Sequence, residues 1–106
     1  MIIDCGAFQL DPGPRANLQN GQPAAARIHA RNIILATEPP VRLSAQNVIS
    51  GRVSRLATAG GEMLVHIDSG QSVIAEVTPR AVKELELREG QSIYWIVKSH
   101  SIAVDA

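Results

Sequence analysis

Two apolar alternations on either side of a short polar turn constrain the fold of this chain more than any other feature. The alternating apolar positions are Met63, Val65, Ile67, Val73, Ala75 and Val77. Strand side chains point in turn to opposite faces, so an apolar residue at every second position gives a strand one buried face. The turn between the two runs, Asp68-Ser69-Gly70-Gln71, is rich in residues that favour tight connections. The pattern predicts an antiparallel hairpin with one face in a core.

Further short strands follow the same logic. Residues 48–57 form a run rich in β-branched and apolar residues, and Ile93, Trp95 and Val97 alternate again. Ile102 and Val104 indicate a last strand. Many short strands separated by turn signals about every ten residues predict an all-β fold, a small closed barrel of the OB-like type.

One short helix interrupts the strands. Thr78 suits the N-cap position, and Pro79 suits the first helical position because it has no N–H to leave unpaired. Val82 and Leu85 lie three residues apart and give this helix an apolar side, and Gly90 ends the turn after it. The expected fold class is therefore all-β with one short helix.

A strand-rich segment precedes the barrel. Residues 26–36 read as one strand, which Glu38-Pro39-Pro40 ends, because proline removes a donor and restricts the residue before it. We interpret residues 37–42 as a link. The predicted division is an accessory segment over residues 1–40 and a barrel over residues 41–106.

Composition and missing motifs exclude several function classes. Ten basic residues balance ten acidic ones, and a neutral chain lacks the positive charge that drives binding to nucleic acid. No G-x-x-x-x-G-K-[ST] loop is present, so we expect this chain not to be an enzyme that hydrolyses ATP by that route. Cys5 is the only cysteine, which excludes an internal disulfide and is compatible with a reducing compartment. No apolar run approaches the ~20 residues of a membrane span.

Polar residues gather where predicted strands and the helix begin or end. The candidate oxyanion-binding residues are Ser44, Ala45, Gln46, Asn47, Thr78, Lys98 and Ser99. Hydroxyls, amides and backbone N–H groups supply directional donors, and the ammonium group supplies charge. Local roles remain open for the same residues: backbone bonding in a strand-entry turn, protection of a sheet edge by the lysine, and helix capping by the threonine. We expect the three histidines to face solvent.

These stretches also resemble a known family. The pattern Ser-Ala-x-Asn-x-x-x-Gly-x-Val, starting at Ser44, is similar to the opening of the Mop-type, or TOBE, small β-barrel domain. Residues 78–91 resemble the middle helix and turn of that domain, and Ile96-Val97-Lys98-Ser99 resembles its closing strand. The preceding residues 30–40 resemble the segment that leads into this domain in the ATP-binding subunit of molybdate ABC importers.

The resemblance implies a function in molybdate import. Domains of this family bind molybdate or tungstate and pair across subunits, so we expect a homodimer whose occupancy regulates the importer. The implied partner is the membrane subunit of the transporter, at the cytoplasmic face of the cell membrane, and no nucleic acid is expected. ATP would be bound only by the domain that precedes this region in the family, which we expect to be missing from this chain.

Two departures from the family pattern leave alternatives open. Gln46 stands where the family usually has arginine, and Ala81 stands where it has a hydroxyl, so two expected ligands are absent. One alternative is a structural dimerisation module without a ligand. Another is a free-standing molybdate-binding storage protein, although such proteins resemble only the region from about residue 43 onward.

Overall fold

The computed structural model describes residues 3–4, 9–10, 25–44 and 47–105. The strands in these residues are β1 (Ile3–Asp4), β2 (Gln9–Leu10), β3 (Ala25–Ile28), β4 (Ile34–Ala36), β5 (Asn47–Ala59), β6 (Glu62–Asp68), β7 (Ser72–Val77), β8 (Ser92–Val97) and β9 (Ile102–Asp105). The helices are α1 (Pro79–Glu84) and the 3-10 turns η1 (Ala30–Asn32) and η2 (Ser99–Ser101). The predicted all-β class with one short helix is confirmed. Among the described helices, none has the length and apolar character to cross a membrane.

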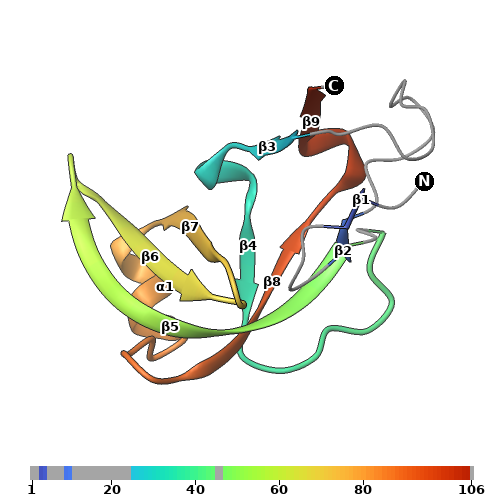
Figure 1. Cartoon of the computed structure of the whole chain (residues 1–106). Coiled ribbons are helices and arrows are strands. Elements are labelled where there is room, and N and C mark those ends of the chain that lie inside the picture. The colour runs from blue at the N-terminus through green and yellow to red at the C-terminus, as the bar shows by residue number, and fades with distance from the viewer. Residues whose placement is uncertain (1–2, 5–8, 11–24, 45–46, 106) are drawn as a thin grey trace.

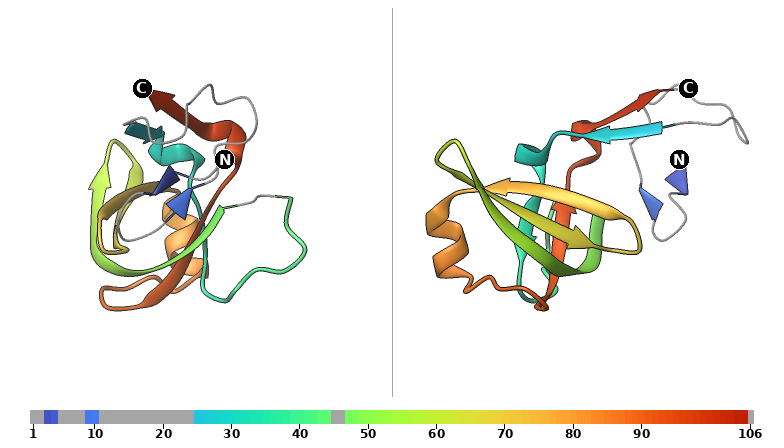
Figure 2. Two further views of the ribbon diagram at one scale, coloured as in Figure 1. Left: turned by 45° about the vertical axis from the view of Figure 1, so that its right-hand side comes forward. Right: turned by 60° about the vertical axis from the view of Figure 1, so that its left-hand side comes forward.

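A five-stranded antiparallel sheet forms the body of the molecule. Its strand order is β4-β8-β5-β6-β7, and the long strand β5 curves so that β6 and β7 fold back over the sheet (Figure 1). Strand β7 contacts both η1 and β4, which brings the two edges of the sheet together as a small barrel. The pairs β1–β2 and β3–β9 lie beside this barrel, at the end opposite α1 (Figure 2).

The predicted hairpin alternation is confirmed. Val65, Ile67 and Ala75 are fully buried, and Val73 and Val77 pack partly against the same core. Trp95 on β8 is also fully buried, and its indole nitrogen donates to Ser69 Oγ over 2.8 Å. The turn between β6 and β7 is thereby tied to the centre of the barrel.

The predicted helix start is confirmed as well. Thr78 caps α1, and its Oγ1 accepts a hydrogen bond from the backbone N–H of Ala81 over 3.1 Å. Pro79 occupies the first turn, and Val82 and Leu85 pack partly against the core.

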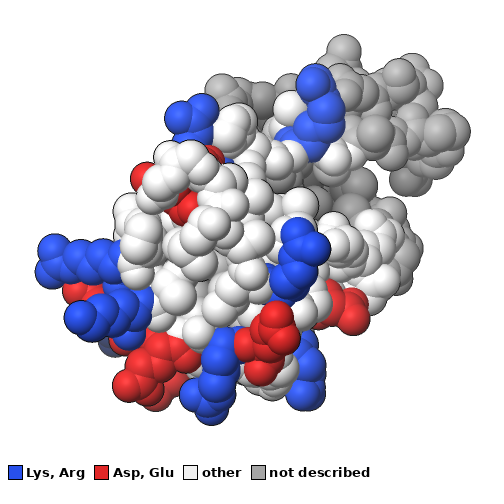
Figure 3. Space-filling model, turned by 90° about the vertical axis from the view of Figure 1, so that its left-hand side faces the viewer, with Lys and Arg blue, Asp and Glu red and all other residues white. Residues whose placement is uncertain are grey.

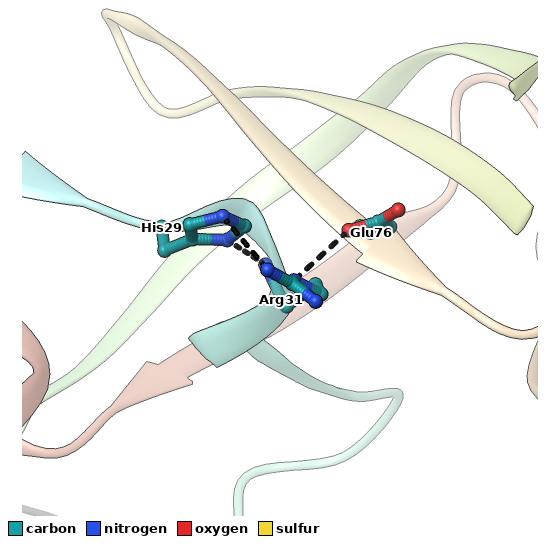
Figure 4. Close-up of polar contacts among 3 residues, drawn as sticks. All are labelled: His29, Arg31 and Glu76. Atoms are coloured by element: carbon teal, nitrogen blue, oxygen red, sulfur yellow. Dashed lines mark hydrogen bonds and ion pairs between the residues drawn. The ribbon is translucent and has the colours of Figure 1, made fainter.

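The predicted continuous strand over residues 26–36 is wrong. The backbone turns at η1, where His29 Nδ1 accepts from the N–H of Arg31 and His29 O accepts from the N–H of Asn32. Arg31 also lies 3.7 Å from a carboxylate oxygen of Glu76 on β7 (Figure 4). The break lets the two halves serve different partners, because β3 pairs with β9 while β4 pairs with β8. The division at residue 40 remains a prediction, and β4 on its N-terminal side is part of the five-stranded sheet.

Candidate functional site

The pairing of β5 with β8 brings two of the predicted polar groups together. The strands are antiparallel, and Asn47 at the start of β5 is the partner of Val97 at the end of β8. The chain therefore enters β5 and leaves β8 at the same end of this strand pair. Ser44 comes from the first group and Lys98 and Ser99 from the second.

Asn47 is the buried polar residue at this junction. It is only 4% exposed, and its side-chain amide donates to the carbonyl oxygen of Val97 over 3.3 Å and to Ser99 Oγ over 3.4 Å. A buried amide needs such partners, because an unsatisfied one destabilises the fold. The amide thus holds the end of β8 and the hydroxyl of Ser99 in a fixed relation to β5.

A small hollow lies beside this junction. It has a volume of about 210 Å³ and is lined by Ser44, Lys98, Ser99 and His100. Lys98 has extended backbone angles and is the N-cap of η2, and its carbonyl oxygen accepts from the N–H of Ser101 over 2.9 Å. Strand alternation places Lys98 on the same face as Ile96.

The lining of this hollow suits an anion. Its described lining residues supply one ammonium group, two hydroxyls and an imidazole, and none of them carries a carboxylate. Ammonium and hydroxyl groups donate hydrogen bonds to oxyanions, and a charged donor binds an oxyanion more strongly than a neutral one. Within the described residues, no group of three or more His, Cys, Asp or Glu side chains could hold a metal ion.

Of the other predicted ligands that the structure describes, Thr78 lies away from this hollow. Thr78 is the N-cap of α1, and its hydroxyl caps the helix. In Figure 1, α1 lies on the other side of the barrel from the end of β8. Thr78 is not among the residues that line the hollow. Ala45 and Gln46 lie outside the described residues.

The sequence interpretation missed His100 as a lining residue. His100 is exposed, as expected, but it belongs to η2 and lines the hollow. Its position two residues after Lys98, in the same turn, was the available signal. His66 departs from the expectation that the histidines face solvent, because it is partly buried and its Nε2 has no hydrogen-bond partner in the described structure.

An apolar row crosses the outer face of the sheet beside the hollow. Ile96 on β8 is the register partner of both Ile34 on β4 and Val48 on β5. Ile96 is 3% exposed, while Ile34 is 54% and Val48 is 41% exposed. We call Ile34, Ile96 and Val48 the outer stripe. Ile96 lies two residues before Lys98, so the outer stripe and the hollow are neighbours on one face.

A larger hollow, of about 770 Å³, lies at the other end of the β5–β8 pair. Its lining includes Arg52 and Asp68, which are register partners across β5 and β6 and bring one charge of each sign. Mixed charge is also found elsewhere on the surface: acidic and basic side chains alternate along the lower edge of the face in Figure 3. The hollow at Lys98 differs, because the charged groups that the structure describes in its lining are all basic.

The chain is similar to known proteins of one family. The model of the TOBE domain family matches residues 43–104. The molybdenum import ATP-binding protein ModC of Mesorhizobium japonicum is 38% identical over 90 residues, which cover 83% of this chain and 24% of that protein. ModC of Photorhabdus laumondii is 35% identical over 89 residues, which cover 83% of this chain and 25% of that protein. The chain thus spans about a quarter of the length of the curated relatives it matches.

A solved structure shares the fold. The cytoplasmic molybdate-binding protein ModG, in a crystal form with molybdate bound, superposes with a TM-score of 0.72 and 28% sequence identity. The similarity covers 78% of this chain and 61% of that one.

Proposed function

Because the chain belongs to the TOBE domain family, we propose that it binds molybdate or tungstate in the hollow at Lys98 and regulates molybdate import. The observation that carries the proposal is the charge of this hollow: among its described lining residues, the charged or titratable groups are all basic. The names of the relatives and of the structural neighbour supply the anion class, since both concern molybdenum or molybdate.

The lining residues contribute to anion binding in different ways. The ammonium group of Lys98 supplies the attraction for the dianion, and Ser44 and Ser99 donate hydroxyl hydrogen bonds to its oxygens. Asn47 acts indirectly, because its buried amide holds Ser99. A tetrahedral oxyanion accepts several hydrogen bonds at once, so fixed donors around one charge favour it over a spherical anion such as chloride.

The outer stripe gives the proposal a pairing surface. Exposed Ile34 and Val48 flank Ile96 on the face that also carries Lys98. A second copy of the chain docked there would cover the apolar side chains and close over the hollow. If the anion binds the paired arrangement more tightly than the free one, its occupancy shifts the population towards the pair.

The pairing surface has a matched test. Val48→Glu places a charge in the outer stripe, and Ile74→Glu places the same charge on β7, where Ile74 is 40% exposed against 41% for Val48. We expect sedimentation velocity to show weaker self-association for Val48→Glu only. Equal association of the two variants would remove the outer stripe from the proposal.

The remaining parts of an importer belong to the parent protein. The chain covers 24% of its relative from Mesorhizobium japonicum, and that relative is named as an ATP-binding protein. We propose that ATP is bound by a part of such a protein that this chain does not span. The complete subunit would then work at the cytoplasmic face of the membrane, with the membrane subunit of the transporter as its partner.

Calorimetric titration of the purified chain with molybdate, tungstate and sulfate tests the binding proposal. We expect saturable binding of molybdate and tungstate and weaker binding of sulfate. An absence of heat, together with an unchanged melting temperature in molybdate, would contradict oxyanion binding. The better reading would then be a pairing module without a ligand.

A further inference from the structure

We propose that His100 is a ligand of the oxyanion hollow that binds in its protonated form, so that anion affinity rises as the pH falls. The inference rests on the proposed function of the hollow and adds a specificity-determining residue to it. His100 follows Ser99 in η2 and lines the hollow together with Lys98, Ser44 and Ser99.

The two histidines near this end of the barrel differ in what they contact. Both ring nitrogens of His29 lie within hydrogen-bond distance of Arg31, at 3.2 Å from its backbone nitrogen and 3.3 Å from its guanidinium (Figure 4). Within the part of the chain that the structure describes, His100 makes no hydrogen bond or ion pair and is exposed. The imidazole of His100 is therefore available to a molecule in the hollow, whereas that of His29 is engaged.

Lys98 alone does not balance the charge of a molybdate ion in the hollow. Molybdate carries two negative charges, and Lys98 provides one positive charge among the lining residues. Imidazole is the side chain that ordinarily changes charge between about pH 5 and pH 8, and its protonated form donates from both nitrogens. A bound dianion therefore favours protonation of His100, and protonation of His100 in turn favours the dianion, by the same factor.

The neighbouring charged groups do not oppose this coupling. Arg42 lies two residues before Ser44 in the linker. On the adjoining elements, Ile28 pairs with Ile102, and the residues that follow Ile28 include His29 and Arg31. The carboxylate of Glu76 is engaged with Arg31. The described charged groups on these neighbouring elements are thus basic, or paired with a basic group, and they add to the attraction of the hollow for a dianion.

The test compares three chains by calorimetric titration with molybdate at about pH 6 and about pH 8 at constant ionic strength. We expect the unmodified chain to bind about five- to tenfold more tightly at the lower pH, a range set by one added charge in a solvent-exposed site. His100→Gln should bind equally at both, with the affinity of the unmodified chain at the higher pH. His29→Gln is the matched control and should keep the full pH dependence.

Two further measurements distinguish protonation of His100 from a change in the protonation of the anion. Titration at about pH 7 in two buffers of different ionisation enthalpy should show proton uptake in the unmodified chain and none in His100→Gln. His100→Lys, which carries a permanent charge, should bind tightly at both pH values.

The outcomes are distinct. Binding whose pH dependence is the same in His100→Gln as in the unmodified chain overturns the role of His100 and leaves the proposed function standing. No binding by the unmodified chain at either pH overturns the proposed function and this inference together.

Discussion

The two ends of the β5–β8 ladder carry hollows of opposite character. At one end, where Asn47 pairs with Val97, the hollow has Lys98 and His100 as its charged or titratable groups. At the other end, where Arg52 pairs with Ser92, the hollow is larger and includes both Arg52 and Asp68. The larger hollow offers an anion no net attraction, because its opposite charges are direct partners across two strands. Size alone is thus a poor guide to a binding site on this barrel.

The largest expected effect is the loss of anion binding in Lys98→Ala. A hydrogen bond to a charged group contributes about 1.5 to 3 kcal/mol, so molybdate affinity should fall about 10- to 100-fold. Lys83→Ala is the matched control, because Lys83 is the only other lysine and is exposed on α1, away from the hollow. Calorimetric titration measures the molybdate affinity of both variants, and an unchanged affinity in Lys98→Ala would contradict the proposed site.

Asn47→Ala should lower the stability of the fold, and any effect on molybdate binding should be indirect, through Ser99. The substitution removes the donor to Val97 O and to Ser99 Oγ in a buried place, at a cost of about 1 to 3 kcal/mol in the free energy of unfolding. Urea unfolding measures this change, and Asn32→Ala on the exposed turn η1 provides the control. Equal stability of the two variants would mean that Asn47 does not hold the junction.

Thr78→Ala tests whether a second copy completes the hollow. Loss of the N-cap should cost about 0.5 to 2 kcal/mol of unfolding free energy, while Thr78→Ser should keep the cap. We expect molybdate affinity to stay unchanged, since Thr78 does not line the hollow of its own chain. An affinity that falls in Thr78→Ala and is retained in Thr78→Ser would show that pairing brings this hydroxyl to the anion.

Arg52→Ala should have the smallest effect. Its guanidinium donates to the carbonyl oxygen of Gly90 over 3.2 Å from an exposed position. Exposed substitutions of this kind usually change stability by less than about 0.5 kcal/mol, and molybdate affinity should change by less than about twofold. A large loss of affinity in this variant would move the anion site to the other end of the ladder.

Local sequence patterns predicted most of the strands and the helix, because side-chain periodicity and helix capping depend on residues that are close in the sequence. The alternation around Val65 and Ile67 and the pair Thr78-Pro79 depend on periodicity and capping, which the sequence states directly. The break at η1 could not be predicted, because it depends on which partners β3 and β4 find in β9 and β8. Tertiary pairing of this kind overrides local strand propensity.

The candidate site was predictable in part for a similar reason. Asn47 and Lys98-Ser99 stand beside strand ends, so a correct pairing of β5 with β8 brings them together. The place of Thr78 relative to the hollow depends on the curvature of the whole sheet, which no local pattern reveals. His100 lies in a 3-10 turn that the sequence does not indicate, and it lines one hollow together with Ser44 from a distant part of the chain.

The ladder between β3 and β9 has a consequence for how the protein is made. Ala25 is paired with Asp105, and Ile34 with Ile96, so β3 and β4 each pair with a strand that lies far away in the sequence. Such non-local pairings slow folding, because a long loop must close before any contact offsets the lost chain entropy. During synthesis the hairpin of β6 and β7 can form early, whereas β4 has no partner until β8 has left the ribosome. Lys98 and His100 follow β8 in the sequence, so the proposed anion hollow can form only after β8 has been made and has paired with β5.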